Sequence, residues 1–150
     1  MKITVLGSAG QIGAYLTEYL KKKGHTVHEM DITIDPWWHD LTRHNNSHLM
    51  ERLLDSDFCF FLAFDVGGSR YLKKYQHTYE FLDNNAKMMV EVFNQLKLCD
   101  VPFVFASSQM SNMSHSPYGL AKAMGELYTK ALGGLIVKFW NVYGIEKDHE

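Results

Sequence analysis

Lys2-Ile-Thr-Val-Leu6-Gly7-Ser-Ala-Gly10-Gln-Ile-Gly13 joins a short apolar run to a glycine-rich turn with the spacing G-x-x-G-x-x-G. We expect Gly7 to permit a tight turn after a strand, Gly10 to let the backbone approach a pyrophosphate, and Gly13 to let the next helix lie close to the sheet. A helix N-terminus after such a turn favours the negative charge of a phosphate. The stretch therefore predicts a strand, a turn and a helix that bind a dinucleotide, with contacts from Gly7, Gly10, Gln11, Ile12 and Gly13.

An acidic residue stands where such a unit places the ribose of its nucleotide. Residues 11–23 carry apolar residues at helical spacing, and residues 26–30 indicate a second strand that ends at Asp31, 18 residues after Gly13. An acid at about this offset hydrogen-bonds the adenosine ribose of NAD, whereas the 2′-phosphate of NADP requires an arginine or lysine nearby. Residues 32–42 contain neither. Asp31 therefore favours NAD over NADP; the alternative is that Asp31 only opens a turn.

The composition excludes several classes of protein. The chain is 46% hydrophobic and 21% charged with a net charge of −2, which indicates one globular domain without the basic surface that nucleic acid requires. The longest apolar run, at 58–64, is too short to span a bilayer, and the N-terminus lacks a signal-peptide pattern. We expect a cytoplasmic protein without a membrane or nucleic-acid partner. The cysteines and histidines lack metal-ligand spacing, so we expect free thiols and no metal site.

Segments typical of strands alternate with segments typical of helices along the rest of the chain. The segment 57–63 is apolar throughout after Asp57, and such a run is typical of a strand buried in a parallel sheet. The pattern predicts an α/β fold, a Rossmann-type doubly wound parallel sheet in a single domain, with the ligand at the carboxyl ends of the strands. We expect further strands at 38–41, 57–63, 102–106 and 135–140, and helices at 47–54, 71–98 with a break near His77, and 117–132.

Tyr118 and Lys122 stand four residues apart in the last of these helices and therefore share one face. A lysine ammonium there stabilises a phenolate, whose pKa is ordinarily about 10. Lowering that pKa to about 7, with help from a cationic nicotinamide ring, takes about 4 kcal/mol. The pair predicts an acid–base site in which Tyr118 takes or gives a hydroxyl proton. The alternative is a tyrosine at the edge of the core beside a solvated lysine.

These features, in this order, resemble the extended short-chain dehydrogenase/reductases, in particular the NAD-dependent nucleotide-sugar epimerase/dehydratase family, over essentially all 150 residues. The resemblance implies that Ser108, Tyr118 and Lys122 are catalytic. It favours Ser108 over Ser107 because successive strand residues point to opposite sides. It also implies cofactor contacts from Asp31, Asp40, Leu41, Leu62, Ala63, Tyr118 and Lys122, an organising role for Asn85 in its helix, and a substrate contact from Asn141 in the segment 138–144.

The resemblance further implies an enzyme that acts on a nucleotide sugar with NAD. Tyr118 would remove a hydroxyl proton while a hydride passes to NAD, and the transient keto sugar would be epimerised or reduced with Ser108 hydrogen-bonded to its oxygen. Gln109 and Met110 follow Ser108 where the family's dehydratases usually carry an acid, which disfavours elimination. Two alternatives stay open: an NAD(P)-dependent reductase of a non-sugar hydroxy or keto substrate, and a non-catalytic NAD-binding or scaffold protein.

Members of that family run to about twice this length and use the later residues for a lobe that grips the nucleotide sugar. We therefore expect these 150 residues to be part of a longer chain, with the C-terminal substrate lobe absent here. The resemblance also implies a homodimer through the helices that contain Asn85 and Tyr118. Trp37 and Trp38 either flank adenine or pack a short strand against a helix, and packing is favoured.

Overall fold

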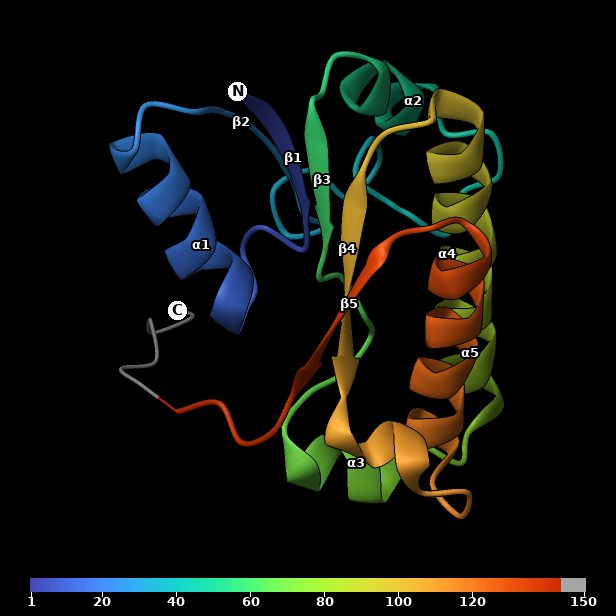
Figure 1. The fold of residues 1–150 in the computed structure, drawn as a ribbon. Coiled ribbons are helices and arrows are strands. Elements are labelled where there is room, and N and C mark those ends of the chain that lie inside the picture. The colour runs from blue at the N-terminus through green and yellow to red at the C-terminus, as the bar shows by residue number, and fades with distance from the viewer. Residues whose placement is uncertain (144–150) are drawn as a thin grey trace.

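Five parallel strands form the sheet at the centre of the computed structural model, which describes residues 1–143 (Figure 1). From β1 the chain moves outward to β2 and then returns to the other side of β1, so the order is β2-β1-β3-β4-β5. This reversal is the switch point of a doubly wound sheet. It confirms the predicted Rossmann-type α/β fold. The strands are β1 (Lys2–Leu6), β2 (Thr26–Met30), β3 (Phe58–Phe61), β4 (Phe103–Ser108) and β5 (Leu135–Phe139).

Helices lie on both faces of the sheet. One face carries α1, and the other carries α4 and α5 side by side, with α2 packed against α4 (Figure 1). The break predicted near His77 is confirmed, because the Thr78 hydroxyl accepts a hydrogen bond from the Phe81 amide at 3.3 Å and caps a new helix. The helices are α1 (Gln11–Lys22), α2 (Ser47–Leu54), α3 (Ser69–Tyr75), α4 (Tyr79–Cys99), the short 3₁₀ helix η1 (Gln109–Asn112) and α5 (Pro117–Ala131).

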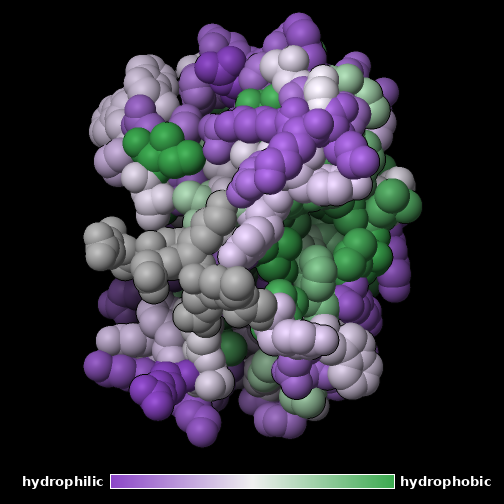
Figure 2. All heavy atoms as spheres, turned by 90° about the vertical axis from the view of Figure 1, so that its left-hand side faces the viewer, coloured by the Kyte–Doolittle hydropathy of each residue, from purple (hydrophilic) through white to green (hydrophobic). Residues whose placement is uncertain are grey.

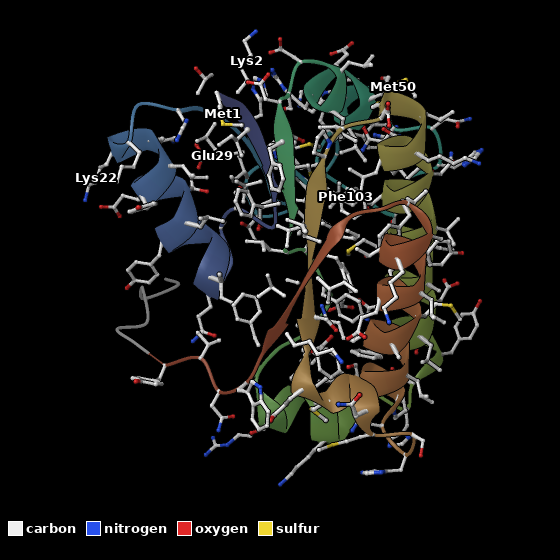
Figure 3. The ribbon with its side chains drawn as sticks, viewed as in Figure 1. Met1, Lys2, Lys22, Glu29, Met50 and Phe103 are labelled. Atoms are coloured by element: carbon white, nitrogen blue, oxygen red, sulfur yellow. The ribbon has the colours of Figure 1, made fainter. Side chains whose placement is uncertain are left out.

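The larger core lies between the sheet and the layer formed by α4 and α5. The buried rings of Phe61, Phe93 and Phe105 meet there with centroid separations of 5.3, 5.3 and 5.6 Å. Phe103, near the amino end of β4, packs on the same cluster (Figure 3). Alternate residues of β4 thus face this core, as the two-residue period of a strand requires. Ring pairs in these geometries stabilise the fold by about 1 kcal/mol each beyond their burial.

α1 lies on the opposite face of the sheet (Figure 1). α1 packs on β1 and helps to bury Ile3, Val5 and Leu20. On the edge strand β5, Leu135 and Val137 keep 62% and 43% of their surface exposed. Figure 2 shows hydrophobic residues gathered on this side of the molecule. Contiguous apolar surface of this kind is typical of a contact surface.

The strand predicted at 38–41 is wrong, because this segment forms turns. Asp35 Oδ1 accepts hydrogen bonds from the amides of Trp37 and Trp38, both at 2.9 Å, and Asn46 Nδ2 donates to the Trp38 carbonyl at 3.1 Å. Side chains therefore satisfy backbone groups that a neighbouring strand would otherwise have to pair. Trp37 is 62% exposed, and the Trp38 ring lies 6.0 Å from the His48 ring of α2. No strand is present in this segment for the two tryptophans to pack against a helix, contrary to the prediction.

Candidate active site

The glycine turn joins β1 to α1 at the carboxyl ends of the strands. Gly7 has a φ of +85°, which glycine adopts readily, and a Cβ on it would lie 2.8 Å from the Ala63 nitrogen. A Cβ on Gly13 would lie 2.0 Å from the Gly7 carbonyl oxygen, so this glycine lets α1 begin directly against the turn. A Cβ on Gly10 would meet just the Gly7 carbonyl oxygen, at 3.3 Å. The space in front of the N-terminus of α1 is thereby open to a phosphate.

Asp31 follows β2 and lies beside the glycine turn. Its Oδ2 accepts a hydrogen bond from the Ala9 amide at 3.1 Å, and its Oδ1 accepts from the amide and the hydroxyl of Thr33 at 3.0 and 2.8 Å. The carboxylate therefore opens a turn and also stands next to the start of α1, which Gln11 and Ile12 form. Because a carboxylate oxygen accepts more than one hydrogen bond, this position fits an acid that binds a ribose hydroxyl.

Four other residues with predicted cofactor contacts follow β2 and β3. Asp40 Oδ1 accepts hydrogen bonds from the amide and the hydroxyl of Thr42, at 3.0 and 2.7 Å, and so closes a turn. The Leu41 side chain is buried in the larger core. Leu62 and Ala63 come directly after β3, and Ala63 lies against the glycine turn.

Ser108 and Tyr118 meet at the carboxyl end of β4. The Ser108 hydroxyl accepts a hydrogen bond from the Met110 amide at 3.2 Å, whereas Ser107 points to α5 and donates to Glu126 at 2.6 Å. Tyr118 is half-buried in the first turn of α5. Burial raises the pKa of Tyr118 above its ordinary value, and a hydrogen bond with Ser108 opposes part of that rise. Tyr118 is thus protonated at neutral pH.

Lys122 lies one turn further along α5 and is buried. Its ammonium donates to the Ala106 carbonyl at 2.8 Å and stands 5.9 Å from the centre of the Tyr118 ring. Burial lowers the pKa of Lys122 to about 7. The structure therefore differs from the predicted lowering of the Tyr118 pKa. A lysine this desolvated carries its charge only part of the time at neutral pH, and its ammonium is directed at a carbonyl.

We predict that the buried Lys122 makes stability rise with pH. Above pH 7 and up to the ordinary lysine pKa of about 10.4, the unfolded chain binds a proton that the folded chain lacks, so each pH unit adds up to about 1.4 kcal/mol to the free energy of unfolding. Lys122→Met keeps a flexible side chain without the amine and should remove this slope. Urea unfolding of both proteins between about pH 7 and pH 8.5 measures the difference.

The upper limit of that pH range is chosen to limit the contribution of the buried Cys59 thiol, which ionises at higher pH in the unfolded chain. Burial raises the pKa of this thiol, so the unfolded chain loses a proton first and stability falls at higher pH. Lys87→Met is the matched control, because Lys87 is exposed and paired with Asp83. The control should keep the wild-type slope. Equal slopes in the wild type and in Lys122→Met would contradict the burial of a neutral amine.

Asn85 fixes the loop that follows β3. Its side chain accepts a hydrogen bond from the Asp65 amide at 2.8 Å, and it donates to the carbonyls of Asp65 and Phe81 at 3.2 and 2.9 Å. Asn85 is buried, so water does not replace these partners. The side chain thus holds the backbone of the loop against α4.

Asn85→Ala is expected to lower the free energy of unfolding by about 3 kcal/mol, because one buried and two partly buried hydrogen bonds of about 1 kcal/mol each are lost. Chemical unfolding measures this loss. The neighbouring Asn84→Ala is the control: Asn84 is exposed and its contact with Asp65 Oδ2 is 3.4 Å long, so its loss should stay within about 0.5 kcal/mol. A similar loss in both variants would contradict the role of Asn85.

The sequence analysis missed Glu126, a buried carboxylate one turn beyond Lys122. Glu126 accepts the Ser107 hydrogen bond and lies 3.4 Å from the Lys138 ammonium on β5. Burial pushes the pKa of Glu126 upward, but the Ser107 and Ser111 hydroxyls and the Lys138 ammonium together outweigh it, and the pKa lies below its ordinary value. A signal was present, since Tyr118, Lys122 and Glu126 are spaced by four residues and share one helix face.

Asn141, the predicted substrate residue, is exposed and follows β5. Phe139 at the end of β5 pairs in register with Ser108 at the end of β4. Asn141 therefore follows β5 at the carboxyl ends of the strands, where Ser108 ends β4. Gly144, the last residue of the predicted segment 138–144, lies outside the described residues.

A hollow of about 440 Å³ lies at the amino ends of the strands, opposite the glycine turn. Its lining includes Met1 and Lys2 at the start of β1 (Figure 3). Ligands of doubly wound sheets bind at the carboxyl ends of the strands, so this hollow is not the candidate site. Within residues 1–143 there is no group of three or more histidine, cysteine, aspartate or glutamate side chains that could hold a metal ion. No helix of that part of the chain has the length and apolar character to cross a bilayer.

A glycine turn after β1, an acid after β2, a serine at the end of β4 and a tyrosine and a lysine on α5 form the arrangement expected of a dinucleotide-binding α/β protein with an acid–base group. The model of the NAD dependent epimerase/dehydratase family matches residues 3–150. The chain therefore belongs to this family of enzymes, whose cofactor is NAD. No curated protein sequence matches the chain.

Several solved structures are similar to the chain. The dTDP-4-dehydrorhamnose reductase from Bacillus anthracis, in complex with NADP, has a TM-score of 0.77 at 19% identity, with 98% of this chain and 56% of that chain covered. TunA, an NAD-dependent NDP-hexosamine 5,6-dehydratase of tunicamycin biosynthesis, has a TM-score of 0.75 at 21% identity, with coverages of 98% and 57%. The UDP-N-acetylglucosamine 4-epimerase from Bacillus cereus has a TM-score of 0.63 at 21% identity, with 92% of this chain and 52% of that chain covered. The chain thus spans little more than half the length of these proteins, and the likeness shows the fold.

Proposed function

We propose that this chain carries the cofactor site and the acid–base group of an NAD-dependent enzyme that epimerises a nucleotide sugar, or epimerises and reduces it, through a transient keto sugar. The observation that carries the proposal is the group of Ser108, Tyr118 and Lys122 at the carboxyl end of β4. Membership of the family supports it. We further propose that the lobe that grips the sugar lies outside these 150 residues.

The residues that would hold NAD lie at the carboxyl ends of the strands. The glycine turn and the N-terminus of α1 would face the pyrophosphate, and Asp31 would accept a hydrogen bond from the adenosine ribose. The fit rests on Gly10, whose hydrogen in place of a side chain leaves room for the phosphates. NAD would supply the hydride acceptor and donor that the reaction needs.

Tyr118 would move the proton at the substrate hydroxyl, and Ser108 would hydrogen-bond the same oxygen. The raised pKa of Tyr118 suits the step in which it gives a proton to the oxygen of the keto sugar. The opposite step needs the phenolate, which the charged form of Lys122 on the same helix face favours. A lysine pKa of about 7 places that charge within reach of neutral conditions.

The same residues would serve an NAD(P)-dependent reductase of a non-sugar substrate. Such an enzyme consumes one reduced cofactor for each product molecule, whereas an epimerase regenerates its cofactor in every cycle. A non-catalytic NAD-binding or scaffold protein is disfavoured, because binding alone needs the glycine turn and Asp31 but not Ser108, Tyr118 and Lys122.

The test incubates the longer protein, with the proposed sugar-binding lobe included, with NAD and with UDP-, dTDP- and GDP-sugars, and identifies the sugar products by NMR. Epimerisation gives a stereoisomer from a catalytic amount of NAD without net NADH, whereas a reductase consumes NADH in proportion to product. Tyr118→Phe is the inactive control. The absence of any product from a protein that includes the sugar-binding lobe and binds NAD would contradict the proposed activity of these residues.

We also propose a homodimer through α4 and α5, which lie side by side on one face of the sheet (Figure 1). Both helices expose large apolar side chains, a feature typical of an interface: Leu82, Val90, Leu120, Met124 and Leu127. Leu127→Glu should convert the dimer to a monomer in sedimentation experiments. A wild-type chain that sediments as a monomer at micromolar concentration would contradict this proposal.

A further inference from the structure

The ring of Phe64 covers the proposed catalytic pair. The ring centre lies 3.9 Å from the Lys122 ammonium nitrogen, closer than the rings of Phe105 and Tyr118 at 5.0 and 5.9 Å. The same ring meets Tyr118 edge to face, with 5.7 Å between centroids. A desolvated ammonium and an aromatic face attract each other, so this arrangement is stabilising.

Phe64 also lies between the two halves of the candidate site. Ala63, the residue before it, contacts the glycine turn at Gly7, and the Phe64 ring reaches Tyr118 and Lys122. A dinucleotide whose pyrophosphate lies at the glycine turn and whose nicotinamide end lies at Tyr118 has to pass this residue.

The backbone around Phe64 is held in place. Asn85 binds both the amide and the carbonyl of Asp65, and the Val66 amide donates to the Phe64 carbonyl at 2.9 Å. A change in the position of the ring therefore requires a change of its side-chain torsions and not of the loop.

We propose that the Phe64 ring and the nicotinamide ribose of NAD compete for the space in front of Lys122, so that Phe64 sets the affinity for the nicotinamide half of the cofactor. The inference rests on the proposed function. The ring has to turn away before the ribose binds, and apparent affinity falls by the fraction of molecules in which it has done so. The lowered pKa of Lys122 agrees with a ring that keeps water from the ammonium.

The test compares NAD with ADP, a probe that ends at the pyrophosphate, by calorimetric titration of the wild type, Phe64→Ala and Phe64→Leu. Phe64→Ala should tighten NAD binding about ten-fold and change ADP binding by less than about two-fold. Phe64→Leu keeps an apolar side chain but removes the aromatic face, and should show a smaller gain. Unchanged or weaker NAD binding in Phe64→Ala, with ADP bound equally by both proteins, would overturn the inference.

A second measurement follows the Lys122 amine itself. Acetylation of Lys122 by a small amine reagent, read by mass spectrometry, should be several-fold faster in Phe64→Ala, and NAD should slow it. Equal rates in the two proteins would overturn the inference, and Phe64→Leu carries both tests if Phe64→Ala fails to fold. Failure of NAD and ADP to bind either protein would instead contradict the proposed function.

Discussion

Replacing Tyr118 by phenylalanine should lower kcat by about 10²–10⁴-fold, the usual loss when a general acid–base group is removed. Phenylalanine keeps the ring against Phe64 and removes only the hydroxyl that Ser108 contacts. NAD affinity should therefore change by less than about three-fold, so that the loss appears in the chemical step. Steady-state kinetics on the active nucleotide sugar, with calorimetry for NAD, measures both quantities.

Tyr128→Phe is the matched control for this variant. Tyr128 lies on the same helix, and its ring stacks on Phe93 at 5.0 Å. Tyr128 lies near the end of α5, far from Ser108. The kcat of Tyr128→Phe should therefore stay within about two-fold of the wild-type value. Similar activity in Tyr118→Phe and Tyr128→Phe would exclude Tyr118 as the proton-transfer group.

Gly13→Ala should destabilise the fold by about 3 kcal/mol or more, because the added Cβ would lie 2.0 Å from the Gly7 carbonyl oxygen and 3.0 Å from the Ser8 Cα. These neighbours are backbone atoms, so the strain cannot be relieved by a side-chain rotation. A fall of about 10 °C in Tm is the expected readout for a domain of this size.

Gly10→Ala provides the contrast within the same turn. Its Cβ would meet the Gly7 carbonyl oxygen at 3.3 Å, a contact that a small shift relieves, so stability should change by less than about 1 kcal/mol. A Gly13→Ala protein as stable as Gly10→Ala would contradict the close approach of α1 to the turn.

Local patterns predicted most of the fold. The glycine turn, the helix at 47–54 and the break before α4 each depend on residues within one or two turns of chain, such as the Asn46 cap that accepts from the Leu49 amide. No strand forms at 38–41, because the structure of this segment depends on the side chains of Asp35 and Asn46 and not on its apolar residues alone. Those side chains bind the backbone and replace a strand partner.

The sequence predicted which residues make up the candidate site, but it did not predict the directions of the Tyr118 and Lys122 pKa shifts. The four-residue spacing of Tyr118 and Lys122 placed them on one face. Their pKa directions depend on burial, to which the Phe64 ring contributes, and for Tyr118 also on the hydrogen bond with Ser108. Both of these neighbours come from other parts of the chain. No periodicity within α5 contains that information.

Calorimetric titration of the chain with NAD and NADP, alongside Gly10→Val and Asp31→Ala, tests the central claim most directly. We predict that the wild type binds NAD more tightly than NADP, that Gly10→Val loses NAD binding because its side chain fills the phosphate space, and that Asp31→Ala loses the preference for NAD. A wild-type chain that binds neither dinucleotide, or a Gly10→Val chain that binds NAD as well as the wild type, would contradict the assignment of the glycine turn as the cofactor site.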